Sequence, residues 1–192
     1  ASRKLNFNAR KTMQAAQALY EGVDVKGVGT VGLITYMRTD SLRIAQEALD
    51  SVRSFIPAAF GNKYLPKSAK FYKSRKGSQD AHEAIRPTDV ALTPDMLKAS
   101  LTNEQFKLYK LIWARFVASQ MEDAELEVVR ADIEAAGNTF KASGSRVIFD
   151  GFMKVYTEGS DEEDSSNEKQ TMLPALLEGQ VLILSELEPK QH

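Results

Sequence analysis

The segment GLITYMRTDS, residues 32–41, carries the side chains best suited to chemistry on a phosphate group. Tyr36 supplies a phenol, and Arg38, two positions later, supplies a guanidinium. Side chains two residues apart point to the same side of an extended backbone, so both groups are expected on one face. A nearby cation favours the phenolate, and a guanidinium can hold a phosphate oxygen through paired hydrogen bonds. The spacing fits a tyrosine nucleophile, although a half-buried strand tyrosine beside a surface arginine also fits it.

The residues after Arg38 predict a helix start beside this pair. A helix can begin at Asp40 or Ser41 and end at Pro57, because apolar residues recur between them at three- and four-residue steps. These residues are Leu42, Ala45, Leu49, Val52 and Ile56. Free N–H groups at the start of a helix attract anions. Tyr36 and this helix start would then form a phosphate-binding cradle around a nucleophile.

Three further helices are expected around this segment. One runs from Asn8, a favourable N-cap, to Gly22, a favourable helix end. Its apolar face is expected to contain Met13, Ala16 and Tyr20. A short helix begins at Thr93 with a proline in its first turn. The longest runs from Thr102, which can form a capping box with Gln105, to about Met121. Its apolar stripe contains Phe106, Tyr109, Trp113, Phe116 and Val117.

After residue 122 the apolar pattern changes to alternation, which is typical of strands. The alternating pairs are Leu126 and Val128, Phe140 and Ala142, and Val147 and Phe149. Turns are expected at Gly137-Asn138 and at Gly144, and another strand at 181–184. The sequence predicts an α+β fold with a helical domain at residues 1–122 and a β-rich domain at 123–192.

Composition and charge narrow the function classes. The absence of cysteine excludes thiolate metal sites and cysteine nucleophiles, and the presence of only two histidines argues against a histidine-rich metal centre. No apolar run approaches the ~20 residues of a membrane span, so a membrane protein is not expected. Residues 1–122 contain 19 basic and 11 acidic residues, whereas residues 123–192 contain 6 and 15. This asymmetry suggests that the helical domain faces a polyanion.

A basic run with interleaved aromatic residues is a second candidate for contact with a polyanion. It contains Lys63, Lys67, Lys70, Lys73, Arg75 and Lys76, together with Tyr64, Phe71 and Tyr72. Cations beside exposed rings suit single-stranded nucleic acid, because phosphates meet the cations and bases stack on the rings. A solvated loop fits the same pattern.

The motif HEAIRP forms a third cluster of titratable groups, with His82, Glu83 and Arg86 ahead of Pro87. The proline places the cluster at a helix end or turn, where a histidine often only satisfies backbone groups. The spacing differs from the HExxH pattern of zinc enzymes, so no zinc site is indicated.

Four stretches of the sequence resemble the type IA DNA topoisomerases. They are GLITYMRTDS, ASRKLNFNARKTMQAAQALYEG at the N-terminus, QDAHEAIRPTDV at residues 79–90, and LYKLIWARFVASQM. The form YMRTDS is more similar to the bacterial topoisomerase I branch than to topoisomerase III, in which proline commonly follows the tyrosine. The resemblance covers nearly the whole chain, and the motifs occur in the order of the family.

This resemblance implies a function and a set of residue roles. Residues 1–122 would be the helical gate domain, and residues 123–192 part of the arch or hinge. Tyr36 would attack one DNA strand, remain linked to the 5′ phosphate and allow negative supercoils to relax without ATP. Arg38 would assist catalysis and contact DNA. The same segment and the second motif would supply further DNA contacts, namely Thr39, Asp40, Ser41, His82 and Arg86.

The resemblance also implies partners and a cofactor. The family uses Mg²⁺ bound by a separate Toprim domain, so no metal ligand is expected in this chain, which would be an inactive fragment alone. The expected partners are a single-stranded DNA segment and the remaining domains of the same polypeptide, in the cytoplasm and without a membrane. An alternative interpretation is a DNA-binding or structural module without activity. A recombinase or rolling-circle initiator is disfavoured, because clustered arginines or a histidine metal pair are missing.

Overall fold

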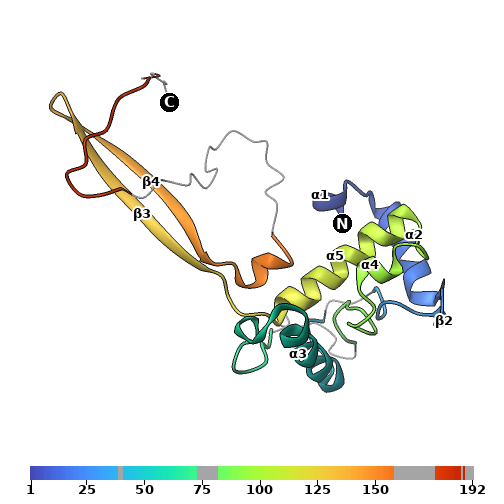
Figure 1. Ribbon diagram of the computed structural model, residues 1–192. Coiled ribbons are helices and arrows are strands. Elements are labelled where there is room, and N and C mark those ends of the chain that lie inside the picture. Colours follow the sequence, from blue (N-terminus) through green and yellow to red (C-terminus); the bar gives the residue numbers. More distant parts are fainter. Residues whose placement is uncertain (39–40, 73–81, 158–175, 187, 189–192) are drawn as a thin grey trace. The chain divides into compact units, whose positions relative to one another are not determined.

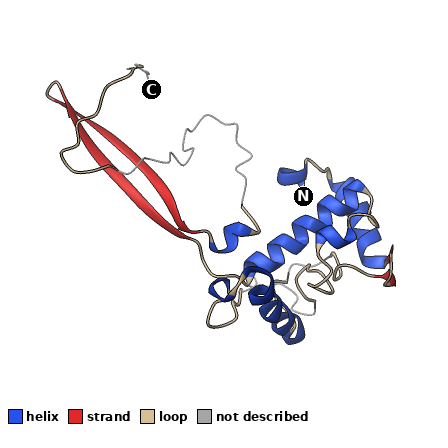
Figure 2. Ribbon diagram, in the orientation of Figure 1, coloured by secondary structure: helices blue, strands red, loops and turns tan. Residues whose placement is uncertain are grey.

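The computed structural model describes residues 1–38, 41–72, 82–157, 176–186 and 188, and it is an α+β structure (Figure 1). These residues form two compact units. The first contains residues 1–124 and 150–157, and the second contains residues 125–149 and the described residues after 175. Helices dominate the first unit, whereas the second is built on a pair of long strands (Figure 2).

The first unit contains five helices, two short strands and two 3₁₀ turns. In chain order these elements are α1 (Ser2–Leu5), α2 (Ala9–Glu21), β1 (Val23–Val25), β2 (Gly29–Val31), α3 (Gln46–Phe60), η1 (Asn62–Tyr64), α4 (Pro94–Leu97), α5 (Asn103–Ser119) and η2 (Gly151–Lys154). Strands β1 and β2 pair in an antiparallel hairpin. Helix α2 packs against α5, and this pair forms the centre of the unit (Figure 1).

Helix α2 has the predicted ends but a different buried face. The Asn8 side chain accepts a hydrogen bond from the backbone N–H of Lys11 at 2.8 Å, and Gly22 follows the last turn. The buried residues are Ala15, Ala16 and Leu19. The predicted face was wrong in part, because Met13 and Tyr20 are exposed. Small residues on the buried face allow close contact with α5, and this packing decides the orientation of the helix.

Helices α4 and α5 confirm their predictions. Thr93 and Pro94 begin α4, and Thr102 forms the predicted capping box with Gln105. The Tyr109 hydroxyl donates to the carbonyl of Leu92 at 2.6 Å. Burial raises the pKa of Tyr109, and the nearby Asp89 carboxylate raises it further. Helix α5 therefore fixes the turn that follows the HEAIRP motif.

Helix α3 begins later than the sequence predicts. Its first residue is Gln46 rather than Asp40 or Ser41, and Pro57 lies inside it. The preceding backbone is held by tertiary hydrogen bonds instead. The Arg43 carbonyl accepts from Ala84 N–H at 2.8 Å, and Ala45 N–H donates to the Glu83 carboxylate at 3.3 Å. These contacts use backbone groups that a longer helix would have needed, so the predicted start was wrong.

Residues 150–157 belong to the first unit, although they follow the hairpin in sequence. The Tyr64 hydroxyl donates to the Asp150 carboxylate at 2.7 Å, and Phe152 N–H donates to the Glu122 carbonyl at 2.9 Å. Gly151 has a positive φ of 46°, and a Cβ there would collide with the Asp123 carbonyl. The change of apolar periodicity at residue 122 does not predict that residues 150–157 pack on the first unit.

The second unit is built on the antiparallel hairpin of β3 (Glu125–Ala135) and β4 (Asn138–Phe149). The turn residues Ala136 and Gly137 both have positive φ, as a tight two-residue hairpin requires. Two predictions for this unit were wrong. Gly144 pairs with Val129 inside the ladder, and residues 181–184 form no strand. That segment is exposed and pairs with no strand in the described part of the chain, so its β-propensity alone does not order it.

Candidate active site

The tyrosine segment lies antiparallel to the HEAIRP motif. Ile34 forms a β-bridge with Pro87. The backbone N–H of Thr35 donates to the Arg86 carbonyl at 2.9 Å, and the Arg86 N–H donates to Thr35 Oγ1 at 2.9 Å. Two motifs that are almost fifty residues apart in sequence therefore form one structural unit through reciprocal hydrogen bonds.

The same segment is attached to the end of α2. Leu33 N–H donates to the Leu19 carbonyl at 2.7 Å. Leu33 and Ile34 are both fully buried, so the segment is not the regular alternating strand that was predicted. Alternation holds only at its end, where Met37 is buried between two exposed neighbours, Tyr36 and Arg38. The buried residues fix the backbone, and the two reactive side chains remain at the surface.

Tyr36 is the exposed residue whose side chain is best suited to act as a nucleophile. Its side chain is 37% exposed, and its ring contacts two other rings. The Tyr20 ring lies 5.4 Å away at 63°, an edge-to-face arrangement, and the His82 ring lies 5.7 Å away at 38°. Among the described residues, the Tyr36 hydroxyl has no hydrogen-bond partner. The Tyr36 ring thus contacts two neighbouring rings while the residue remains partly exposed.

Arg38 and Ser41 differ in their availability. The Arg38 side chain is exposed and makes no hydrogen bond or ion pair with any residue that the structure describes. Ser41 is buried, and its Oγ accepts from Arg43 N–H at 3.1 Å, which shapes the loop before α3. Thr39 and Asp40 lie outside the described residues. The predicted helix-start anion site at Asp40-Ser41 is wrong, because the first residue of α3 is Gln46.

Glu83 and Arg86 form an ion pair in the HEAIRP motif, which is hydrogen-bonded to the tyrosine segment; this pair is called the Glu83 clamp. Glu83 Oε2 accepts hydrogen bonds from Arg86 Nε at 2.8 Å and from Ala45 N–H, and Arg86 Nη2 lies 2.8 Å from the same oxygen in an ion pair. Arg86 Nη1 donates to the Pro87 carbonyl at 3.0 Å. The two side chains are 27% and 12% exposed. The Arg86 guanidinium therefore makes contacts within the protein, whereas the Arg38 guanidinium is exposed.

The environment of Glu83 shifts its pKa. Partial burial raises the pKa, but the hydrogen bonds and charge of Arg86, the Ala45 N–H and the charge of Arg43 together hold it below the ordinary value. A carboxylate with a lowered pKa stabilises the fold above the unfolded-state pKa, and this contribution disappears as the pH falls through the folded-state value.

We therefore expect Glu83→Gln to destabilise the protein at neutral pH and to have little effect in acid. The difference in free energy of unfolding from the unchanged chain should shrink as the pH falls below 4.5, the ordinary value. Urea unfolding between pH 7 and pH 3, followed through the fluorescence of Trp113, the single tryptophan of the sequence, measures this difference. A difference that stays constant over this range would contradict the role of the ionised carboxylate.

The described part of the basic run is partly used for folding. Lys70 Nζ pairs with the Asp123 carboxylate at 2.6 Å, and the Tyr64 ring is buried. The Tyr72 hydroxyl donates to the Ser119 carbonyl at 2.8 Å, whereas Phe71 is 78% exposed. Lys73, Arg75 and Lys76 lie outside the described residues. Contact of this run with nucleic acid stays a prediction.

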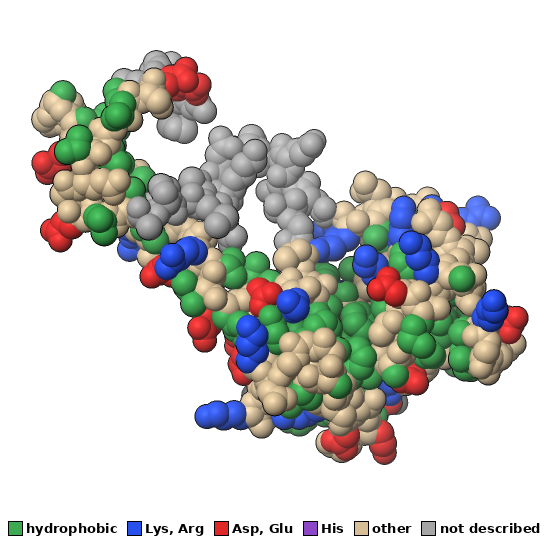
Figure 3. Space-filling model, in the orientation of Figure 1, with side chains coloured by type: hydrophobic (Ala, Val, Ile, Leu, Met, Phe, Trp, Pro, Cys, Tyr) green, Lys and Arg blue, Asp and Glu red, His purple; other side chains and the backbone are tan. Residues whose placement is uncertain are grey.

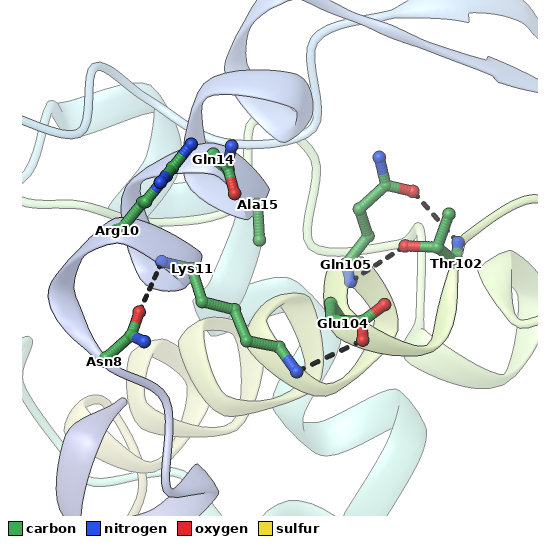
Figure 4. Close-up of a pocket in the computed structure, with 8 residues that line it drawn as sticks. All are labelled: Asn8, Arg10, Lys11, Gln14, Ala15, Thr102, Glu104 and Gln105. Atoms are coloured by element: carbon green, nitrogen blue, oxygen red, sulfur yellow. Dashed lines mark hydrogen bonds and ion pairs between the residues drawn. The ribbon is translucent and has the colours of Figure 1, made fainter.

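The charged groups on the first unit are interspersed. On the face drawn in Figure 3, lysine and arginine side chains lie beside aspartate and glutamate side chains and form no continuous basic surface. A groove of about 460 Å³ lies between the N-terminal turns of α2 and α5 (Figure 4). Its floor contains the helix caps and the ion pair between Lys11 and Glu104 at 3.2 Å. These polar groups stabilise the helix starts.

Metal-ligand clusters and membrane-spanning helices are both absent from the described part of the chain. In the described part of the chain, no three His, Asp or Glu side chains lie together as a metal ligand set would require. None of the described helices has the length and apolar character needed to cross a membrane. Tyr36 and Arg38, two exposed side chains that are two positions apart in sequence, remain the best candidates for reactive groups.

Comparisons with known proteins agree with the motifs. A family model described as DNA topoisomerase matches residues 1–192. The solved structures include full-length topoisomerase I from Thermotoga maritima, which is 40% identical with a TM-score of 0.69. The match covers 88% of this chain and 27% of that chain, so this chain spans about a quarter of the length of its relative. Together with the ordered motifs around Tyr36, these matches show that the chain belongs to the bacterial type IA DNA topoisomerase family.

Proposed function

We propose that this chain is the tyrosine-bearing part of a longer topoisomerase that relaxes negatively supercoiled DNA by transient cleavage of one strand. Tyr36 is the nucleophile. The observation that carries this proposal is the position of Tyr36 on the family motif, as an exposed residue on a backbone that is hydrogen-bonded to both α2 and the HEAIRP motif. A buried or hydrogen-bonded phenol would have opposed it.

The reaction exchanges one phosphoester for another. Tyr36 Oη attacks the phosphorus of a single-strand phosphodiester, a Tyr–O–P bond forms, and the bond from phosphorus to the 3′ oxygen breaks. The phenol loses its proton, and the leaving 3′ oxygen gains one and becomes a hydroxyl. The 5′ phosphate stays on the protein. Attack by the 3′ hydroxyl reverses each change, so the cycle needs no ATP.

Arg38 and Arg86 have different roles in this proposal. The exposed Arg38 guanidinium binds a non-bridging phosphate oxygen and stabilises the charge that develops during attack. Arg86 holds Glu83 and its own loop, so it acts by positioning. His82 is exposed beside the Tyr36 ring and is placed to contact the DNA strand. DNA contacts by Thr39, Asp40 and Ser41 stay predictions.

The domain and cofactor assignments belong to the same proposal. Residues 1–122 form the gate domain, and residues 123–192 contribute to the arch, with 150–157 packing on the first unit. Mg²⁺ is the cofactor that the family implies. Its ligands are proposed to lie in the separate Toprim domain that the family resemblance implies, and the part of the chain that the structure describes contains no group of three His, Asp or Glu side chains. No catalytic step derived from this chain uses the metal.

The polarity of the covalent link tests the proposal. The complete enzyme is incubated with a single-stranded oligonucleotide labelled at either its 3′ or its 5′ end, and the reaction is stopped with denaturant. The 3′ label is expected on the protein, on a peptide that contains Tyr36, and the 5′ label on a shorter free fragment with a 3′ hydroxyl. A 5′ label on the protein, or a link to another residue, would overturn the assignment.

A DNA-binding module without its own chemistry is the second candidate. The exposed ring of Phe71 within the basic run favours it. In this case the chain alone binds single strands, with an affinity that falls steeply with salt, and Lys67→Ala reduces the slope. Absence of binding by the chain at low salt would leave a structural role only.

A further inference from the structure

Tyr20 is the residue whose position the function has not yet explained. It lies in the last turn of α2, it is 42% exposed, and its ring is in edge-to-face contact with Tyr36. A tyrosine that served only the core would be buried, as Tyr109 is. The interaction of Tyr20 that bears on function is its ring contact with Tyr36, the proposed nucleophile.

The backbone fixes this ring relative to the tyrosine segment. A Cβ at Gly32 would lie 2.7 Å from the Tyr20 carbonyl oxygen, so only glycine permits the approach of the segment to α2. The Gly32 carbonyl accepts from the Thr88 hydroxyl at 2.7 Å, and Leu33 N–H bonds to the residue before Tyr20. The rings of Tyr20 and Tyr36 therefore contact each other because the tyrosine segment is hydrogen-bonded to the end of α2.

We propose that Tyr20 is a positioning residue that restricts the side-chain orientation of Tyr36 for in-line attack on a DNA phosphodiester. This inference rests on the proposed role of Tyr36 as nucleophile. An exposed tyrosine can occupy several staggered side-chain conformations. Contacts with the Tyr20 and His82 rings favour the one in which the phenol is held between its neighbours. The ring of Tyr20 matters here, and its hydroxyl does not.

The proposal is distinct from direct DNA binding by Tyr20. A ring that stacked on a base would strengthen DNA affinity, whereas a ring that orients the nucleophile changes the rate at saturating DNA. Edge-to-face pairs of this type correspond to a factor of roughly 2 to 10 in a rate or an equilibrium. The two roles therefore separate in a measurement that resolves binding from cleavage.

The experiment compares Tyr20→Leu and Tyr20→Phe in the complete enzyme that contains this chain. Single-turnover formation of the covalent adduct is measured over a range of single-stranded oligonucleotide concentrations. Tyr20→Leu is expected to slow cleavage at saturation about 3- to 10-fold with unchanged DNA affinity. Tyr20→Phe, which keeps the ring, should retain the rate of the unchanged enzyme. Met13→Leu, an exposed position on the same helix, serves as the control and should also retain it.

Three outcomes would overturn the inference. These are an unchanged rate in Tyr20→Leu, a loss confined to DNA affinity, and an equal loss in Tyr20→Phe. In each of these cases the adduct still forms on Tyr36, so the proposed function stands. If the unchanged enzyme forms no adduct on Tyr36, the proposed function itself fails. Urea unfolding of the same substitutions in this chain, followed through Trp113 fluorescence, verifies that they leave it folded.

Discussion

Replacement of Tyr36 by phenylalanine is expected to reduce formation of the covalent DNA adduct by at least about 1,000-fold, which corresponds to roughly 4 kcal/mol of transition-state stabilisation. Phenylalanine keeps the ring that contacts Tyr20 and His82 but has no oxygen to attack phosphorus. The measurement is denaturing electrophoresis of the complete enzyme after incubation with an end-labelled oligonucleotide.

The substitution should leave the fold and DNA binding intact. The Tyr36 hydroxyl has no hydrogen-bond partner within the described ranges, so its removal leaves no unpaired group. Urea unfolding and oligonucleotide binding of Tyr36→Phe are expected to match those of the unchanged enzyme. The Tyr20→Phe variant, which removes the neighbouring hydroxyl, is the matched control and should keep cleaving DNA. Persistent adduct in Tyr36→Phe would show that another residue is the nucleophile.

Glu83→Ala is expected to lower the free energy of unfolding by about 2–3 kcal/mol at neutral pH. The change removes the acceptor for Arg86 Nε and for Ala45 N–H, together with the ion pair to Arg86 Nη2. The Arg86 side chain is only 12% exposed, so its charge is left without a partner in a largely buried place. The loop that carries His82 and the loop before α3 lose the connection through the Glu83 side chain and keep the backbone hydrogen bond from Ala84 N–H to the Arg43 carbonyl. Adduct formation should fall as well, because the tyrosine segment is hydrogen-bonded to the same loop.

Glu104→Ala is the control for this prediction. Glu104 also pairs with a cation, Lys11, but both side chains are 44% exposed. An exposed ion pair is screened by water, so this variant should unfold at the same urea concentration as the unchanged chain. Equal destabilisation by both substitutions would mean that the Glu83 clamp has no special role. Unchanged stability of Glu83→Ala would contradict it directly.

The elements that the sequence predicts well are those with local determinants. The ends of α2 and α5 depend on caps within three residues, namely Asn8 for α2 and the Thr102–Gln105 box for α5. The start of α3 depends on a distant segment, because Ala84 and Glu83 bind the backbone that precedes the helix. Periodicity within one stretch carries no information about such a partner.

The site was predictable to a similar extent. The exposed pair Tyr36 and Arg38 follows from their spacing around Met37. The partners of the Arg86 guanidinium, Glu83 and Pro87, are local in sequence, whereas the contact of Glu83 with the Ala45 N–H is long-range and could not be predicted from the motif. Tyr20 was assigned to an apolar face, although its place beside Glu21 and the helix-ending Gly22 signals a surface position near the following loop.

The return of residues 150–157 to the first unit has a consequence for biosynthesis. The acceptor for the Tyr64 hydroxyl and the donor for the Glu122 carbonyl are provided by Asp150 and Phe152, which are translated after the whole β3–β4 hairpin. The β3–β4 hairpin must therefore leave the ribosome before the first unit can form all of its contacts. Until then, Tyr36 of the nascent chain belongs to a first unit that still lacks the contacts made by residues 150–157.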